Sequence, residues 1–282
     1  MKKVCVITLG VLVVLLIVSL TLALFQKSIP LRSRVGLIRI EGPILDSKNS
    51  VEELKEFVRD NSIKAIILRI DSPGGAVAPS QEIYSEVKKA VSKKKIVVSM
   101  GSVAASGGYY IASPATRIIA NPGTLTGSIG VIMEIPNLEG LMSKIGIKTE
   151  VIKSGRNKDI GSVFRGMKKE EKEILQGVMD NVHEQFIRAV SEGRKMKIEA
   201  VRLLADGRVF TGEQAKANGL IDELGTLEDA TNTAARLAGI KEEPEVVTKK
   251  DRLSILELLR NKFPQEILDV FPTLRIKYLF SP

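Results

Sequence analysis

Short apolar runs alternate with amphipathic patterns through the first half of the chain. Four runs are rich in β-branched residues and are bounded by turn residues, as buried strands are: 35–40, 65–70, 96–100 and 117–120. Residues 51–59 and 80–91 lie between these runs and have the periodicity of helices. Strand–helix alternation at this spacing predicts an α/β fold with a largely parallel sheet.

The second half of the chain has mainly helical patterns. A long amphipathic helix is predicted over 168–194, because its apolar side chains fall on one stripe: Leu175, Val178, Val182, Phe186 and Val190. Three shorter helical patterns follow it: 198–205, 212–218 and 227–238.

The end of the chain has a different composition. The charged stretch 241–251 indicates a linker, and 253–262 predicts a short helix within a tail that runs to Pro282. We expect this tail to dock on its own domain or on another subunit, in preference to the membrane surface.

An uncharged apolar run, Val4–Phe25, occupies the beginning of the chain. As a helix it spans roughly 33 Å, enough to cross the hydrocarbon core of a bilayer. The following sequence, 22-LALFQK-27, is a poor cleavage site for a signal peptidase. Residues 1–27 therefore predict a retained transmembrane anchor. Basic residues flank the run on both sides, so the charge rule alone leaves its orientation open.

Composition limits the classes of function. The chain has 282 residues, 44% hydrophobic and 27% charged, as globular proteins do. The net charge is +9, but aromatic residues make up only 4% and Trp is absent, so we expect no nucleic-acid partner. The single cysteine, Cys5, excludes an internal disulfide and a cysteine-based zinc site.

A glycine-rich turn follows the strand predicted over 65–70. In 71-DSPGGAV-77, Gly74 and Gly75 allow successive backbone N–H groups to point outward together. Such a turn can bind an anion or a developing oxyanion. An ordinary tight turn has the same composition, so this motif alone does not identify a site.

Ser106 lies in 101-GSVAASGGYYIAS-113, after another predicted strand and at the start of a short helical pattern. A serine in this position is usually an N-cap. However, Gly107 and Gly108 clear space beside its hydroxyl, and a parallel sheet would bring the Gly74–Gly75 turn to the same edge. Ser106 is therefore a candidate nucleophile.

A serine nucleophile needs a base. The only histidine, His183, falls beside the apolar stripe of the long predicted helix, and we interpret it as a half-buried structural residue. A lysine in an apolar pocket can accept a proton instead. The chain has many lysines, and composition does not choose among them.

Four motifs in series resemble signal peptide peptidase A, the membrane-bound Ser–Lys peptidase family, in its short single-domain form. They are 71-DSPGG-75, 101-GSVAASGGYY-110, 124-TLTGSIGV-131 and 153-KSGRNKDIGS-162. The resemblance covers residues 35–238, in the order of the family, and the tail after residue 241 has no match.

The resemblance implies a role for individual residues. Ser106 would be the nucleophile, Lys158 the general base, and Ser128 the hydroxyl that hydrogen-bonds the lysine amine. The oxyanion hole would be formed by three backbone positions: Gly74, Gly75 and Gly107. No metal or cofactor is expected. Because Lys158 must be neutral to accept a proton, activity is expected to rise toward alkaline pH.

Three charged residues close to Lys158 in the sequence are not given a catalytic role. We interpret them as solvated side chains: Lys153, Arg156 and Asp159.

The resemblance also implies the fold, the assembly and the substrate. The fold would be that of the Clp protease and crotonases, with repeated strand–strand–helix units over residues 28–240, followed by a linker and tail over 241–282. Members form homo-oligomeric rings or domes, and a site can include residues from neighbouring protomers. The substrates would be peptides, namely remnant signal peptides, and the catalytic domain would lie on the extracytoplasmic face of the cell membrane.

Three alternatives remain open. A crotonase-type acyl-CoA enzyme would share the fold and the paired-amide oxyanion hole. A related membrane peptidase would cut a dedicated membrane-protein partner. A non-catalytic membrane scaffold would retain only a decayed protease domain.

Overall fold

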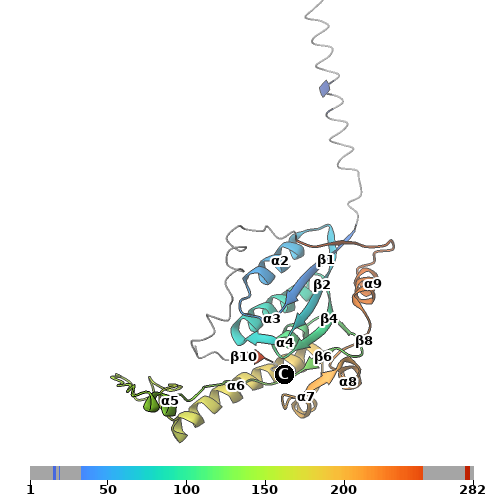
Figure 1. Ribbon diagram of the computed structural model, residues 1–282. Coiled ribbons are helices and arrows are strands. Elements are labelled where there is room, and N and C mark those ends of the chain that lie inside the picture. Colours follow the sequence, from blue (N-terminus) through green and yellow to red (C-terminus); the bar gives the residue numbers. More distant parts are fainter. Residues whose placement is uncertain (1–14, 17–18, 20–32, 250–276, 280–282) are drawn as a thin grey trace, which may run out of the picture. The chain divides into compact units, whose positions relative to one another are not determined.

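The computed structural model describes residues 15–16, 19, 33–249 and 277–279 of the chain (Figure 1). It divides into two units, 1–33 and 34–282. The predicted anchor lies almost wholly outside the described residues, and the helix predicted over 253–262 lies entirely outside them. Within the described ranges, no helix has the length and apolar character needed to cross a membrane.

The four predicted strands are confirmed, and they form the centre of a sheet in the larger unit. β1 (Arg34–Glu41), β2 (Ile63–Ser72) and β4 (Lys95–Ala105) lie side by side and parallel, and β5 (Arg117–Ala120) pairs with β4. Their runs of apolar residues reflect burial on both faces of the sheet.

Four short strands complete this sheet, which has eight strands among the described residues: β6 (Leu125–Gly127), β7 (Val209–Thr211), β8 (Glu223–Leu224) and β9 (Glu245–Val247). Strands of two or three residues are too short to show an alternating pattern, so sequence reasoning did not predict them. β9 pairs with β1 in parallel, although it falls in the stretch interpreted as a linker.

Within residues 33–249, the helices lie close to their predicted bounds, except that α5 was not predicted. They are α2 (Lys48–Arg59), α3 (Val77–Val91), α4 (Gly107–Ala112), α5 (Glu139–Lys144), α6 (Lys169–Arg194), α7 (Ile198–Leu204), α8 (Gly212–Ala217) and α9 (Leu227–Leu237).

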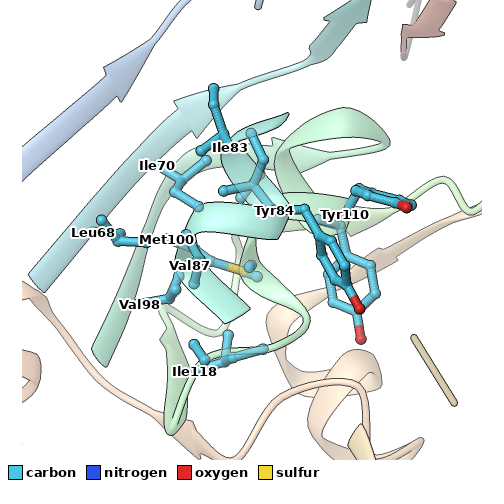
Figure 2. Close-up of a cluster of buried hydrophobic side chains, with 14 of the residues drawn as sticks. Leu68, Ile70, Ile83, Tyr84, Val87, Val98, Met100, Tyr110 and Ile118 are labelled. Carbon is cyan, nitrogen blue, oxygen red and sulfur yellow. The ribbon is translucent and has the colours of Figure 1, made fainter. Parts of the chain in front are cut away.

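The two faces of the sheet bury separate hydrophobic clusters. Val35 and Leu37 of β1 pack with Ala230 and Ala234 of α9 on one face. Because side chains alternate along a strand, the next residues, including Ile38, face the opposite cluster with α2, α3, α4 and α6. Figure 2 shows part of this larger cluster, in which side chains of α3 pack on β2 and β4 beside Tyr110 of α4.

α6 is only half embedded. Phe186 and Val190 of its predicted apolar stripe are buried, and the Phe186 ring packs edge-on against Tyr110 at 4.9 Å between centroids. In contrast, Val178 is 40% exposed, because the first half of α6 extends beyond the sheet toward α5 (Figure 1).

A second, two-stranded sheet joins the tail to the domain. β10 (Lys277–Leu279) runs antiparallel to β3 (Gly74–Ala76), with Tyr278 opposite Gly75. On its other side, Gly75 bridges to Ile44. The described part of the tail therefore lies against the turn that sequence analysis selected as an oxyanion site.

Candidate active site

Ser106 connects β4 to α4 and has an unusual backbone conformation. Its φ is 51° and its ψ is −115°, and its side chain is almost fully buried. A non-glycine residue in such a region costs on the order of 1–3 kcal/mol and persists only where surrounding structure enforces it. Two backbone hydrogen bonds hold Ser106 in this conformation. The Ser106 N–H donates to the Gly127 carbonyl at 2.8 Å, and the Ser106 carbonyl accepts from Tyr110 N–H at 2.8 Å.

The usual role of a serine before a helix does not explain Ser106. Its hydroxyl makes no capping hydrogen bond to α4. α4 is a single short element, and all six of its residues are buried. The hydroxyl is therefore placed at the edge of the sheet without serving the helix that follows it.

The register of the sheet places Ser128 beside Ser106. Ala105 of β4 pairs with Gly127 of β6, and the two serines are the next residues of their strands. Ser128 also has a φ of 51°, and its N–H donates to the Arg208 carbonyl at 2.9 Å. Two serines with positive φ thus follow a paired position at the same edge of the sheet.

The three predicted oxyanion glycines also converge. A Cβ atom on Gly107 would lie 3.2 Å from the Gly75 nitrogen and 3.3 Å from the Gly74 Cα. It would also lie 2.6 Å from the Ser80 hydroxyl oxygen. The turn and the start of α4 can approach this closely only because Gly107 has no side chain.

Hydrogen bonds fix the turn itself. The Gly74 carbonyl accepts from Ile44 N–H at 2.9 Å, and Ala76 N–H donates to the Ile44 carbonyl at 2.8 Å. Because backbone groups of an extended strand alternate between its two sides, the N–H and carbonyl of Gly75 point away from Ile44. That is the side on which β10 lies. Gly74 has a φ of +99°, which favours glycine at this position.

A pocket of about 450 Å³ opens beside Ser128. α6 lines it with Asp180 and His183, and Asp206 lines it from the loop before β7. His183 is half-buried as interpreted, but its Nε2 is buried and has no hydrogen-bond partner in the described part of the chain. The proximity of these residues to Ser128 could not be predicted from the sequence, because no local pattern indicates that α6 crosses this edge of the sheet.

Lys158 does not lie with the serines and glycines. It is exposed, in a turn between α5 and α6 where its N–H donates to the Gly155 carbonyl at 3.1 Å. It does not line the pocket beside Ser128, and within the described ranges no hydrogen bond joins it to either serine. Of the predicted site residues, the structure therefore brings together five and leaves Lys158 apart.

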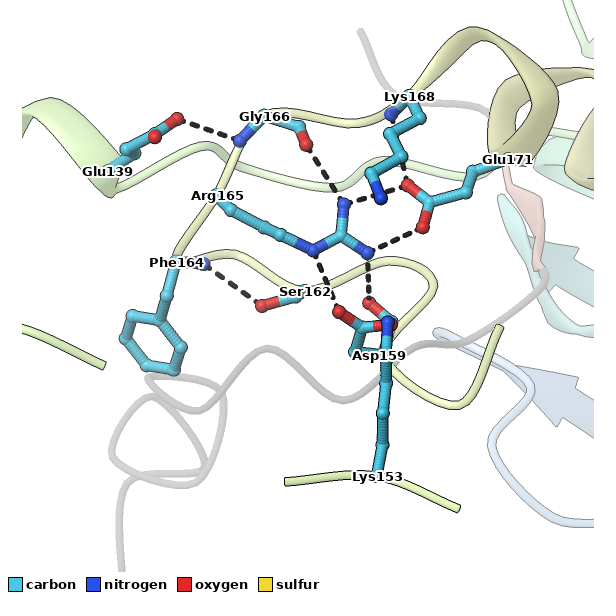
Figure 3. A network of polar contacts seen from close by, with 9 residues as sticks. All are labelled: Glu139, Lys153, Asp159, Ser162, Phe164, Arg165, Gly166, Lys168 and Glu171. Atoms are coloured by element: carbon cyan, nitrogen blue, oxygen red, sulfur yellow. Dashed lines mark hydrogen bonds and ion pairs between the residues drawn. The ribbon is translucent and has the colours of Figure 1, made fainter. Parts of the chain in front are cut away.

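A network of ion pairs holds the turn that carries Lys158 (Figure 3). Arg165 bonds the Asp159 carboxylate through Nε at 2.9 Å and the Glu171 carboxylate through Nη1 at 2.8 Å. Lys153 pairs with the other oxygen of Asp159. Lys153 is exposed, as interpreted, although it forms an ion pair. Asp159 is half-buried, so its interpretation as a solvated side chain is wrong, because its partner Arg165 lies beyond the motif considered.

The network changes the acidity of its carboxyl groups. Hydrogen bonds from Arg165 and then Lys153 hold the pKa of Asp159 well below its usual range. Hydrogen bonds from Arg165 and from the Lys168 backbone N–H lower the pKa of Glu171 to about 2. Both groups are therefore ionised at any pH at which a lysine base could work.

Two family models match the chain. Peptidase family S49 matches residues 88–241, and Clp protease matches residues 34–124. Together these segments contain every candidate site residue and most of the sheet. The Clp protease match agrees with the mixed α/β sheet described above.

Several curated relatives have the names of proteases or peptidases. A putative protease of Synechocystis sp. is 46% identical over 210 residues, covering 74% of this chain and 76% of that protein. Protease 4 of Salmonella typhi is 38% identical over 218 residues, covering 74% of this chain and 35% of that protein. A putative signal peptide peptidase of Enterococcus faecium is 36% identical over 206 residues, covering 72% and 60% respectively. The matched part of this chain thus spans about a third of the length of Protease 4.

Proposed function

Because this chain belongs to peptidase family S49 and is a serine peptidase of that family, we propose that it is a membrane-anchored endopeptidase with a Ser106–Lys158 dyad. The observation that carries the proposal is the conformation of Ser106. Its backbone is strained, its hydroxyl caps no helix, and it lies beside Ser128 and against the glycine turn. Strain of this kind concentrates at functional sites.

The chemistry is acyl transfer. The Ser106 hydroxyl oxygen attacks the peptide carbonyl carbon while the neutral Lys158 amine accepts the hydroxyl proton. The developing oxyanion receives hydrogen bonds from backbone N–H groups of Gly75 and Gly107. Lys158 then donates the proton to the leaving amine, and water, deprotonated by the same amine, releases the acyl group from Ser106.

An extended peptide can reach Ser106 along β3. β10 already runs antiparallel to β3 in register with Gly74 and Gly75, so this edge accepts a strand. Main-chain pairing of this kind binds peptides with little dependence on their sequence. The small side chains around Ser106 leave room for the substrate backbone beside the hydroxyl.

We propose that Lys158 acts on Ser106 of a neighbouring copy in a homo-oligomeric ring or dome. The turn that carries Lys158 is connected through Arg165 to Glu171, at the start of α6. The pocket beside Ser128 is lined by Asp180, which lies about 14 Å further along the same helix. The segment before the turn exposes several large apolar side chains that suit burial between copies: Leu141, Ile145, Ile147, Val151 and Ile152.

Remnant signal peptides in the membrane are the proposed substrates, with the catalytic domain on the extracytoplasmic face. The apolar run at 4–25 and the resemblance to the Enterococcus faecium relative support this assignment. Cleavage of a dedicated membrane-protein partner is the alternative within the same class. Membership in a peptidase family argues against the crotonase-type acyl-CoA reaction.

Covalent labelling tests the nucleophile. The full-length chain is treated with a fluorophosphonate, which reacts with activated serines, and the modified peptide is located by mass spectrometry. We expect the label on Ser106 in the wild type, and its loss in Lys158→Ala. Ser102→Ala, a change at an exposed serine of the same strand, is expected to label normally. A label on another serine, or equal labelling of Lys158→Ala, would overturn the assignment.

A further inference from the structure

The segment that carries Lys158 has no hydrophobic core to hold it. No residue from 131 to 170 is buried, and no helix or strand is present between α5 and α6 in this described stretch. A general base must nevertheless lie within hydrogen-bond reach of its serine, and a misplacement of about 1 Å can cost roughly a hundredfold in rate. Some other interaction must therefore fix the turn.

Arg165 supplies that interaction with all of its donors. Beyond the bonds to Asp159 and Glu171 already described, its Nη1 donates to the Gly166 carbonyl at 3.0 Å. Its Nη2 donates to the Asp159 carbonyl at 3.1 Å and to Glu171 Oε1 at 2.5 Å. A guanidinium has five N–H donors, and each one is used here (Figure 3).

The two ends of this clamp differ in burial and in the element that carries them. Glu171 is only 3% exposed and closes the capping box at the start of α6, where its carboxylate accepts from Lys168 N–H at 3.0 Å. Asp159 directly follows Lys158 in the turn, and its carbonyl accepts from Ser162 N–H at 3.1 Å. Arg165 therefore connects a fixed point on a long helix to the residue next to the proposed base.

The clamp also separates charges. Asp159 is the carboxylate nearest to Lys158 in the sequence, and Arg165 and Lys153 both pair with it. Among the described residues, no ion pair includes Lys158. The other charged groups close to the clamp are Glu139, which accepts from Gly166 N–H at 2.7 Å, and Lys168. Among the described residues, the amine of Lys158 therefore has no carboxylate partner, which leaves it available to accept a proton.

We propose that Arg165 is a positioning residue for the peptidase reaction, because it clamps the turn of Lys158 to α6 and occupies Asp159. This inference rests on the proposed role of Lys158. Arg165 acts through the lysine and does not touch the substrate.

Steady-state cleavage of an internally quenched apolar peptide by the full-length chain tests the inference. Arg165→Ala is expected to lower kcat by a factor of roughly ten to a hundred and to leave KM unchanged, because only the base is displaced. Arg165→Lys is expected to lose kcat as well, since one ammonium cannot reproduce a five-donor fork. Free guanidinium at low, non-denaturing concentration is expected to restore part of the kcat of Arg165→Ala.

Arg202→Ala is the matched control. Arg202 of α7 forms a two-point ion pair with Glu184 of α6, the helix that also carries Glu171. This pair is far from the turn of Lys158 in the sequence. This variant is expected to keep kcat and to gain nothing from guanidinium. Glu171→Gln, which keeps the shape of the side chain, provides a second way to weaken the clamp and is expected to lower kcat in the same manner.

The outcomes separate this inference from the proposed function. If Arg165→Ala and Glu171→Gln keep the wild-type kcat while Lys158→Ala is inactive, the positioning role of Arg165 is wrong, whereas the Ser106–Lys158 dyad is supported. A rise in KM at constant kcat would also overturn it, because Arg165 would then act on substrate binding. If Lys158→Ala is as active as the wild type, the base assignment itself fails.

Discussion

At Ser106, a φ of 51° is imposed on a residue that glycine would replace without steric cost. The chain keeps serine there although its hydroxyl caps no helix. A structural account of this residue would have to explain a strained backbone that brings no evident stability. The proposed role as a nucleophile accounts for it, because Ser106 lies at the edge of the sheet where Ser128 and the glycine turn also lie.

This account predicts a trade-off between stability and activity. Ser106→Gly and Ser106→Ala both remove the hydroxyl and are expected to be inactive. Only glycine relieves the strain, so Ser106→Gly is expected to exceed Ser106→Ala in free energy of unfolding by about 1 kcal/mol. Urea unfolding of the two full-length variants measures the difference. Equal stabilities would show that the backbone at this position stores no strain.

At the scale of elements, β3 is the strand on which the proposed peptide binding depends. Its residues bond Ile44 on one side and pair with β10 on the other. The tail therefore lies where the proposed substrate must pair, and the two would compete.

Deletion of residues 277–282 tests this competition. We expect KM for a peptide substrate to fall and kcat to stay constant, because a strand that is free more of the time binds with higher apparent affinity. Deletion of 280–282 alone, which leaves β10 in place, serves as the control. An unchanged KM after the longer deletion would mean that β3 is not the strand that binds substrate.

The elements also show how far sequence reasoning reaches. The long strands were predictable because β-branched runs such as 65–70 are bounded by turn residues. The proximity of Ser106 and Ser128 depends on β6, which has three residues and no readable periodicity. The position of Lys158 depends on the path of the loop before α6. The position of His183 depends on where α6 crosses the edge of the sheet beside Ser128. Both are set by tertiary contacts that no local pattern records.

At the scale of the whole molecule, the proposal completes the site with Lys158 from a second copy. Ser106 and Ser128 lie together, whereas Lys158 is exposed on a separate turn. Exposed apolar side chains beside that turn, including Ile152, would be covered in an assembly. An isolated chain is therefore expected to be inactive.

Mixing two inactive variants tests this directly. Ser106→Ala and Lys158→Ala are dissociated, combined in equal amounts and reassembled. If each Lys158 serves a neighbouring Ser106, about a quarter of the sites in a ring regain both groups, and activity returns in that proportion. If both groups act within one chain, the mixture remains inactive. Each variant reassembled alone is the control.

Stability should fall at high pH. Burial raises the pKa of Tyr84 to about 12 and that of Tyr110 to about 12. In the unfolded chain both phenols ionise near pH 10. The contribution of this pKa difference to the free energy of unfolding is zero below about pH 10. As the pH rises from about 10 toward 12, the free energy of unfolding falls, because the unfolded state then binds fewer protons than the folded state. Urea unfolding at a series of pH values measures this loss, and Tyr84→Phe should reduce its slope. A slope that Tyr84→Phe leaves unchanged would contradict the prediction.

Hydrolysis of an apolar peptide between roughly pH 6 and 10, below the range in which the tyrosines ionise, tests the central claim most directly. The full-length wild type is compared with Ser106→Ala, Lys158→Ala and the control Lys216→Ala, which changes an exposed lysine of α8. The account predicts that wild type and control cleave, with a rate that rises with pH, and that the other two lose roughly a thousandfold or more. Wild-type cleavage by Ser106→Ala and Lys158→Ala would contradict the dyad. A loss in Ser106→Ala alone would leave the nucleophile in place and make His183, beside Ser128, the base to examine.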